Sequence, residues 1–343
     1  ALDHVRISPD IASDALDAVA QAWLDSGMRV VIAPVVADRP VIETLPFDDG
    51  DLAGLDLSAY GSRPMLPAQA QIDIVEDFHG RWHGRGNGRI SVAIGPSGPQ
   101  RCSDELLKLS ADFSRRHNSI LHMHVLETKL QKEMGHRLYG RGIIAHLNDL
   151  GLLNSRTNLV HSIWLEPGDM DVILATDTSV IHNPVSNARL GSGYCPVTSL
   201  LSEGVRVGLG TDSACCNESA SLLETMKWTA LLQRSQLEDE QSWIGPDMAL
   251  RMGTSIGADA IGLSRTGRIA TGYAADLTLL NINSPAFQPL NDMVRQLILS
   301  ENGSAIDTVM IAGELVVTGG RCVSIDETAI WQEAGEFSEQ RKA

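Results

Sequence analysis

The sequence predicts an α/β fold in which parallel strands alternate with helices. Its apolar segments, such as residues 28–36 and 89–99, are continuous rather than alternating, which indicates strands buried on both faces. Amphipathic helices lie between them; residues 13–26, for example, carry apolar side chains at helical spacing and end just before Gly27. Right-handed crossovers of this kind build either a closed barrel or an open doubly wound sheet.

Six strands and their helices follow in order. Strands are expected at residues 28–36, 89–99, 119–127, 158–165, 179–185 and 205–212, and helices at 13–26, 71–83, 102–117, 128–151, 167–176, 195–204, 219–236 and 246–263. Residues 1–10 carry neither a strand nor a helix start. The polar insertion at 38–67 is long for a connection in a compact domain, so a lid or binding loop is expected there. After Gly262 the sequence pattern changes. Residues 267–282 and 304–323 predict short strands with glycine-rich turns, typical of a small β-sandwich.

Composition excludes several partners. The chain has 343 residues and a formal net charge of −16, which opposes binding to nucleic acid or to an anionic membrane surface. No apolar run of about 20 residues could span a bilayer. The five cysteines are scattered and form no C-x-x-C pair, so we expect no disulfide framework, no thiolate zinc site and a reducing, cytoplasmic location.

The segment ILHMHVLET, residues 120–128, is the first candidate for chemistry. His124 lies at the end of an apolar strand and Glu127 follows three residues later, where enzymes with parallel strands place reactive side chains. Alone, the segment favours a buried histidine bonded to a carbonyl, with Glu127 beginning a helix. Three later strands also end in polar residues that bind metals or carry protons, namely His161, His182 and Asp212. Their repetition favours an active site, although Asp212 by itself is also a good turn residue.

Taken together, these motifs resemble the amidohydrolase superfamily, in the branch of nucleobase and S-adenosylhomocysteine deaminases and s-triazine hydrolases. The matching strings are HVLET at His124, LVHSIWLE at His161, HNPVSNARLGSGYCPV from His182, GLGTDSACCN at Asp212 and the tail TGRIATGYAADL. The resemblance covers nearly the whole chain. It implies a (β/α)8 TIM-like barrel joined to a small β-sandwich domain, and one divalent metal ion, zinc or alternatively iron.

Position by position, the resemblance makes His124 the fifth-strand metal ligand and Asp212 the eighth-strand ligand. Glu127 becomes the proton shuttle and His161 the sixth-strand histidine that steadies a developing oxyanion. Imidazole and carboxylate suit zinc, and a catalytic site leaves one position for a water whose pKa falls to about 7. Strand 89–99 lacks the lysine that bridges two metals in binuclear relatives, so a mononuclear site is expected.

The departure from the family concerns its first-strand H-x-H pair, which has no counterpart upstream of His124. His122-Met123-His124 is not that pair, because the fifth-strand glutamate follows it. The simplest expectation is that roughly a hundred residues, carrying the first two barrel strands and half the sandwich, precede this chain. Residues 1–262 then form the hydrolase barrel from strand three to strand eight, 263–330 part of the sandwich, and 331–343 a C-terminal tail.

Other polar residues near these motifs are candidates for substrate binding. We expect His182, Asn183 and Asn187 to shape the pocket rather than bind metal, because amides offer hydrogen bonds to a heterocycle. Arg189 and Tyr194 fit either the pocket or the open surface. Cys215 and Cys216 are expected to pack or to line the pocket rim, and a metal role for His79 and His83, one helical turn apart, is not favoured.

The function expected is metal-dependent hydrolytic deamination of a nitrogen heterocycle such as a purine, pterin, pyrimidine or triazine. One alternative is an s-triazine hydrolase that releases chloride or an alkylamine. Another is a catalytically inactive chain that lacks the H-x-H ligands. The partner expected is a small heterocyclic substrate, and a homo-oligomer is compatible with the sequence.

Overall fold

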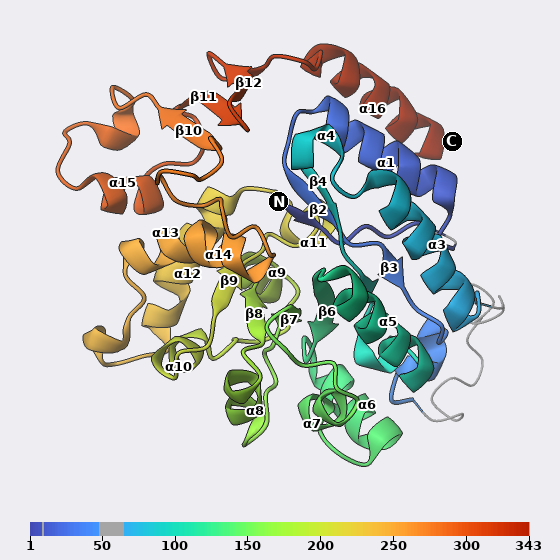
Figure 1. The fold of residues 1–343 in the computed structure, drawn as a ribbon. Coiled ribbons are helices and arrows are strands. Elements are labelled where there is room, and N and C mark those ends of the chain that lie inside the picture. Colours follow the sequence, from blue (N-terminus) through green and yellow to red (C-terminus); the bar gives the residue numbers. More distant parts are fainter. Residues whose placement is uncertain (9, 48–64, 343) are drawn as a thin grey trace.

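A parallel array of strands forms the centre of the molecule (Figure 1). The computed structural model describes residues 1–8, 10–47 and 65–342. Among these, the main strands of the array are β1 (Leu2–Asp3), β2 (Val30–Ile32), β4 (Ile90–Val92), β6 (Leu121–Val125), β7 (Thr157–His161), β8 (Ser179–His182) and β9 (Val207–Leu209).

Hydrogen bonding links these strands side by side in chain order. β1 pairs with β2, β2 with β4, and β6 through β9 pair in sequence, all parallel. A bridge between Ile94 and Leu121 joins the two groups, and β3 (Val35–Val36) pairs with β5 (Gly95–Pro96) beyond β2 and β4. The expected α/β fold with parallel strands is therefore confirmed. Pairing of β9 back to β1 is not among the strand pairs of the described residues.

The opening residues differ from expectation. Leu2 and Asp3 form a strand whose register pairs them with Val31 and Ile32, although no strand was expected in residues 1–10. The array thus has seven members where six were expected. Two residues are too few to show strand periodicity in sequence, and only pairing with β2 reveals the strand.

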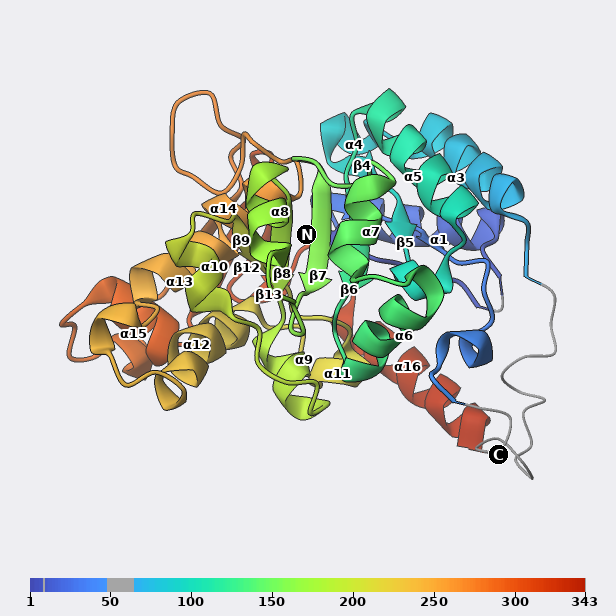
Figure 2. The ribbon, with the colours of Figure 1, turned by 90° about the horizontal axis from the view of Figure 1, so that it is seen from below.

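The helices lie outside the strand array (Figures 1 and 2). They are α1 (Ser13–Asp25), α3 (Ala68–Trp82), α4 (Arg85–Gly88), α5 (Asp104–His117), α6 (Lys129–Tyr139), α7 (Ile143–Asp149), α8 (Asp169–Ala175), α9 (Pro184–Arg189), α10 (Val197–Ser202), α11 (Ala214–Asn217), α12 (Leu222–Leu232), α13 (Pro246–Gly253), α14 (Ser255–Ala260), α15 (Met293–Leu299) and α16 (Glu327–Lys342). Buried side chains such as Leu16 of α1, Phe78 of α3 and Phe113 of α5 join the strands in one core.

The strand expected at residues 179–185 is shorter than predicted. β8 ends at His182, and α9 begins at Pro184. Proline suits the first turn of a helix because its missing N–H has no partner to lose there. The turn brings Ser186 and Asn187 onto a helix directly above the strand ends.

After residue 262 the chain forms a four-stranded antiparallel sheet. Its strands, β10 (Leu277–Leu280), β11 (Ile306–Ile311), β12 (Glu314–Thr318) and β13 (Arg321–Cys322), pair in chain order. Two polar contacts tie this part to the N-terminal helices and strands: Arg29 Nε lies 2.6 Å from Asp276 Oδ2, and Ser324 Oγ donates to Asp25 O at 3.1 Å. Helix α15, between β10 and β11, packs against α12 and α13.

Two further sequence expectations meet the structure differently. Most of the insertion expected to form a lid, residues 48–64, lies outside the described residues; of its first part, Val41–Thr44 forms a 3₁₀ turn. Across the part of the chain that the structure describes, every helix is too short or too polar to cross a membrane.

Truncating a strand side chain tests the core. Leu159 of β7 is fully buried, so Leu159→Ala should lower the free energy of unfolding by about 2–5 kcal/mol through lost burial and a residual cavity. Leu174, which is 43% exposed, is the matched control, and Leu174→Ala should change it by less than about 1 kcal/mol. Chemical denaturation measures both; equal effects would contradict this description of the core.

Candidate active site

His124 lies near the end of β6, held by a backbone carbonyl. Its Nδ1 donates to Ser97 O at 3.0 Å, from the segment after β5. Because a carbonyl only accepts, this bond places the ring proton on Nδ1 and leaves a lone pair on Nε2. Burial, together with His161, lowers the pKa of His124, which keeps the ring neutral. A neutral imidazole with a free Nε2 is in the form that binds a metal ion.

Glu127 follows β6 and is positioned by a glutamine. Gln131 Oε1 accepts from the Glu127 backbone N at 2.7 Å, while Gln131 Nε2 donates to His124 O at 3.0 Å. One side chain therefore fixes both ends of the segment from His124 to Glu127. Burial raises the pKa of Glu127, His124 opposes the rise, and the neighbouring Asp212 carboxylate adds to it. Glu127 thus keeps a proton to higher pH than an exposed glutamate does.

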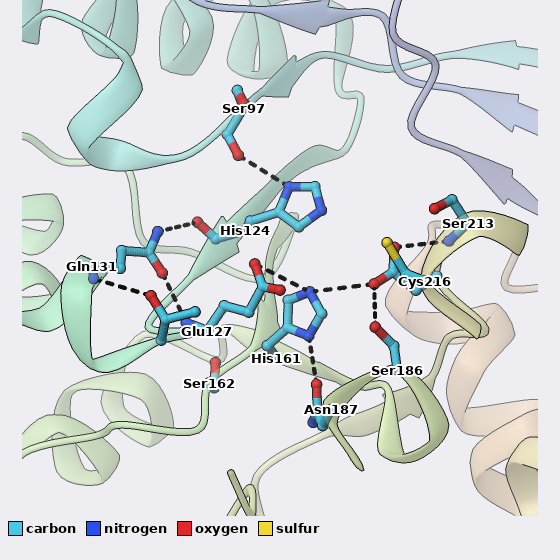
Figure 3. A network of polar contacts seen from close by, with 12 residues as sticks. Ser97, His124, Glu127, Gln131, His161, Ser162, Ser186, Asn187, Ser213 and Cys216 are labelled. Carbon is cyan, nitrogen blue, oxygen red and sulfur yellow. Dashed lines mark hydrogen bonds and ion pairs between the residues drawn. The ribbon is translucent and has the colours of Figure 1, made fainter. Parts of the chain in front are cut away.

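His161 ends β7 and lies between two carboxylates (Figure 3). Its Nδ1 is 2.7 Å from Asn187 Oδ1, which places the proton on Nδ1. Its Nε2 is 3.8 Å from Glu127 Oε2 and 3.9 Å from Asp212 Oδ2. Nε2 is buried and has no hydrogen-bond partner, so a lone pair faces two acidic side chains.

Asp212 follows β9 and is held by two donors. Ser186 Oγ, on α9, donates to Oδ2 at 2.6 Å, and the Ser213 backbone N donates to Oδ1 at 2.8 Å. Hydrogen bonds from two sides restrict the rotation of the carboxylate. Asp212 is therefore directed at His161 by residues from two different elements.

The backbone around these side chains is strained. Leu126, His161 and Ser162 adopt φ values of +54°, +73° and +47°, a region that residues other than glycine, asparagine and aspartate rarely enter, and Asp212 adopts a φ of +61°. All four lie at or just beyond the ends of β6, β7 and β9. Such conformations cost on the order of 1 kcal/mol or more each and cluster at functional sites. In this protein these backbone conformations turn the chain sharply at the strand ends that carry the site residues.

His4 belongs to this cluster but was not expected. Its ring stacks on His124 with centroids 4.9 Å apart and meets His122 edge-on at 5.3 Å. Its Nε2 lies 3.1 Å from Gly95 O, and a side chain at Gly95 would collide with the ring. Burial lowers the pKa of His4 to about 3. The only sequence signal was a histidine after a short apolar opening, too weak to identify the residue without pairing to β2.

The predicted pocket residues fall into two groups. His182, Asn183 and Asn187 are buried at the end of β8 and the start of α9. Asn187 holds His161, and the Asn183 amide nitrogen is placed to donate to Gly210 O at 3.0 Å and His182 O at 3.2 Å. Both ring nitrogens of His182 are buried without a hydrogen-bond partner.

Arg189 and Tyr194 lie farther out. Arg189 forms an ion pair with Glu218, and Tyr194 is 51% exposed. Cys215 is exposed beside Cys216 in α11, with their sulfur atoms 3.8 Å apart. His79 and His83 stack on each other on α3, with ring centroids 4.4 Å apart.

The donors at the site fit a divalent ion only in part. His124 Nε2 and an Asp212 oxygen have the right chemistry, and the buried His161 Nε2 lone pair facing two carboxylates is a place where a positive charge would be stabilised. However, no three His, Cys, Asp or Glu side chains within residues 1–8, 10–47 and 65–342 are arranged to hold a metal ion. A catalytic zinc takes three protein ligands. The described residues therefore supply two donors and not a complete set.

Comparison with known proteins identifies the family. The family model described as "Amidohydrolase family" matches residues 4–316, which contain all the site residues above. The chain belongs to this family. The resemblance inferred from its motifs is thereby confirmed.

Two curated relatives of this amidohydrolase are named deaminases of adenosine derivatives. One, from Methanothermobacter thermautotrophicus, is named 5'-deoxyadenosine deaminase; it is 32% identical over 93% of this chain and 69% of its own length. The other, from Caldanaerobacter subterraneus subsp. tengcongensis, is named 5-methylthioadenosine/S-adenosylhomocysteine deaminase and is 33% identical over 75% of this chain. The match spans 60% of that second relative.

Solved structures share the fold. An adenosine deaminase from Xanthomonas campestris, described with bound zinc, matches 96% of this chain and 70% of its own, with a TM-score of 0.84 and 24% identity. An atrazine chlorohydrolase from Arthrobacter aurescens, complexed with zinc, matches 98% of this chain and 72% of its own, with a TM-score of 0.87 and 22% identity. At these identities the likeness concerns the fold alone.

The buried His182 makes stability depend on pH. Burial, and to a lesser degree His161, lowers the pKa of His182 from 6.5 to about 3, so the unfolded chain takes up this proton first as pH falls. The stabilising contribution of neutral His182 is therefore complete above about pH 6.5 and is lost as the pH falls toward 3. In that range the free energy of unfolding should fall by about 1.4 kcal/mol per pH unit. His182→Asn should remove that slope between roughly pH 6 and pH 4, as measured by urea unfolding.

The matched control is His136→Asn. His136 is 45% exposed and pairs with Glu166 on the surface. Substitution of His136 should leave the pH dependence of the free energy of unfolding nearly unchanged. The parts of that dependence that arise from His182 and from the buried His4 should both remain. An unchanged slope in His182→Asn would show that His182 is protonated in the folded protein.

Proposed function

We propose that this amidohydrolase hydrolytically deaminates a nitrogen heterocycle, using one divalent metal ion, zinc before iron. An aminated purine nucleoside is the foremost substrate class, because relatives at 32–33% identity are named deaminases of adenosine derivatives. The chain spans 60–69% of these relatives, so the proposal concerns the site that these residues build. We also propose that the strand array closes into an eight-stranded barrel and that the C-terminal sheet belongs to a β-sandwich.

One observation carries the proposal. Two carboxylates that follow different strands, Glu127 after β6 and Asp212 after β9, approach the same buried imidazole nitrogen of His161 at 3.8 and 3.9 Å. Deamination needs one group that gives a proton to the ring nitrogen and one that takes a proton from the attacking water. Two carboxyl groups perform opposite tasks when their surroundings differ. Here burial raises the pKa of Glu127, whereas Asp212 accepts hydrogen bonds from Ser186 Oγ and the Ser213 backbone N.

The assignment of protons follows from these contacts. Glu127, whose pKa is raised by burial, donates a proton to the ring nitrogen of the substrate. Asp212 accepts a proton from water and passes it to the leaving ammonia. His161 carries a lone pair on Nε2, so it can steady an oxyanion only after it has taken up a proton from one of the carboxyl groups.

His124 and Asp212 would hold the metal ion. When bound, such an ion lowers the pKa of a coordinated water toward 7 and so supplies a hydroxide at neutral pH. Ser97 supports this role by fixing the tautomer of His124, and Ser186 by fixing Asp212. His182, Asn183 and Asn187 would border the heterocycle, and Arg189 and Tyr194 would lie at the entrance.

The s-triazine alternative uses the same residues with a different leaving group. Fold likeness to an atrazine chlorohydrolase supports the scaffold but not the reaction. Chloride leaves as an anion without taking up a proton, whereas an amino group must be protonated before it leaves as ammonia. The raised pKa of Glu127 therefore favours deamination.

A catalytically inactive chain is the second candidate, favoured by the missing three-ligand set among the described residues. Metal content of the purified chain separates the two. If the site is active, about one equivalent of zinc should remain after dialysis against metal-free buffer, and Asp212→Asn should reduce it. Elemental analysis measures both, with His136→Ala as the control. Less than about a tenth of an equivalent in the unaltered chain would support the inactive candidate.

Replacing the proposed shuttle tests the chemistry. Glu127→Gln removes the transferable proton and keeps the size and the bond from the backbone to Gln131. Ammonia release from an aminated nucleoside should fall by about 10²- to 10⁴-fold, while metal content stays unchanged. Glu166→Gln is the control, because Glu166 is also a partly buried carboxylate but pairs with Lys132 and His136. Turnover of Glu127→Gln near that of the unaltered protein would refute the role.

A further inference from the structure

Two neighbouring cysteines lie in α11, the short helix that follows Asp212. The sulfur atoms of Cys215 and Cys216 are 3.8 Å apart. Cys215 is exposed to solvent and Cys216 is partly buried. Figure 3 shows Cys216 among the side chains of the site, next to Ser213. Neither thiol takes part in the proposed reaction, so the pair is a second reactive group at the edge of the site.

The other cysteines are less reactive. Cys102 and Cys195 are buried, and burial raises the pKa of both thiols to about 12. Cys322 is partly buried in β13, and a hydrogen bond to the Glu327 carboxylate raises the pKa of Cys322. The thiolate is the form of cysteine that attacks an oxidant. These three side chains therefore react more slowly than an exposed thiol does.

Cys215 is both accessible and hydrogen-bonded. Its sulfur lies 2.9 Å from the Ser213 hydroxyl, and this hydrogen bond contributes most to lowering the pKa of Cys215. A thiol that reacts with an oxidant is protected from further oxidation when a second thiol lies next to it. Cys216 is in that position.

A disulfide between these residues cannot form while α11 keeps its helical turn. Successive residues of an α-helix point about 100° apart, so neighbouring side chains do not face each other. The two sulfur atoms must also approach from 3.8 Å to about 2.05 Å. Formation of the bond therefore requires the backbone of α11 to open.

Both ends of α11 are bonded to the segment that carries Asp212. The Ser213 backbone N donates to Asp212 Oδ1 at 2.8 Å, and Asn217 Nδ2 donates to Thr211 O at 2.6 Å. The helix also packs against α9, where Ser186 supplies the other donor to Asp212. Opening of α11 would thus remove or shift the contacts that hold this carboxylate.

We propose that Cys215 and Cys216 are a redox modification site at which a hydroperoxide closes a reversible disulfide and displaces Asp212. With hydrogen peroxide, the Cys215 thiolate attacks one oxygen, the O–O bond breaks, and a sulfenic acid and one water form. Cys216 then attacks the oxidised sulfur, the S–S bond forms, and the oxygen leaves as a second water. The two thiols lose two electrons and two protons, and the peroxide takes them up.

The disulfide is expected to be easy to reduce. The Cα atoms of successive residues are about 3.8 Å apart, whereas those of ordinary disulfides are roughly 4.4–6.8 Å apart. Strained or exposed disulfides are the labile, regulatory kind. A dithiol such as dithiothreitol should therefore restore both thiols.

Peptide mapping tests the modification without reference to activity. The tryptic peptide of residues 207–227 contains Cys215 and Cys216 and no other cysteine. After treatment of the folded protein with hydrogen peroxide, this peptide should be lighter by two hydrogen atoms and should take up iodoacetamide only after dithiothreitol. Two free thiols, a sulfinic or sulfonic acid at Cys215, or a disulfide between two molecules would overturn the proposal.

Hydrogen exchange tests the opening of α11. Backbone amides of residues 213–218 should exchange at least about 10-fold faster in the oxidised protein, because the helical turn is lost. The amides of α5, which is distant in sequence and ends at His117, are the internal control and should not change. Equal exchange of residues 213–218 in both redox states would contradict the proposal.

Ammonia release tests the effect on Asp212, and this part rests on the proposed function. The oxidised protein should release ammonia about 10- to 100-fold more slowly than the reduced protein, because the carboxylate is misaligned. Dithiothreitol should restore the rate. In Cys215→Ser and Cys216→Ser, the rates before and after mild peroxide treatment should be nearly equal, whereas the control Cys322→Ser should keep the full response.

The outcomes separate this inference from the proposed function. If the reduced protein deaminates no compound, but the disulfide forms and exchange rises, the proposed reaction fails and the redox site stands. If the reduced protein is active and the disulfide leaves its rate unchanged, the reaction stands and the redox proposal falls.

Discussion

The site depends on one electrostatic constraint: a buried imidazole nitrogen that needs positive charge nearby. His161 Nε2 has its lone pair directed toward Glu127 and Asp212 because Asn187 holds the ring proton on the other nitrogen. Three electron-rich groups within 4 Å repel one another unless a proton or a cation lies between them. The residues lie at or just after the ends of β6, β7 and β9, which are hydrogen-bonded in one sheet, so the fold itself brings them together. The fold therefore maintains a place for transferable positive charge.

Much of this could be predicted from sequence because it follows from chain order. The carboxyl ends of parallel strands lie at one edge, so His124, His161 and Asp212 were expected near each other before any coordinates. The continuous apolar segments predicted the strands because a parallel strand covered by helices is buried on both faces. Hydrophobic periodicity could not predict β1, because two residues are too few to show a period. His4 was therefore missed as well, since its position depends on the pairing of β1 with β2 and on the open space at Gly95.

The supporting hydrogen bonds were also beyond prediction from sequence. Gln131 bonds to Glu127 and His124, Ser186 to Asp212, and Ser97 to His124, each from an element whose exact end decides the contact. Ser186 reaches Asp212 only because Pro184 ends the strand early and begins a helix. Arg189 and Tyr194 were equally undetermined, since sequence does not distinguish a pocket rim from an open surface.

These supporting contacts bear on whether the site is functional. A chain that had lost its reaction would be expected to relax its costliest features, since nothing would retain them against their effect on stability. Here His161 keeps a φ of +73°, and its Nε2 and both ring nitrogens of His182 remain buried without a hydrogen-bond partner. A left-handed conformation at a residue other than glycine and a buried polar atom without a partner both lower stability, and these lie at the ends of β7 and β8. Their grouping at the carboxyl ends of neighbouring strands is the pattern of a site kept for its chemistry.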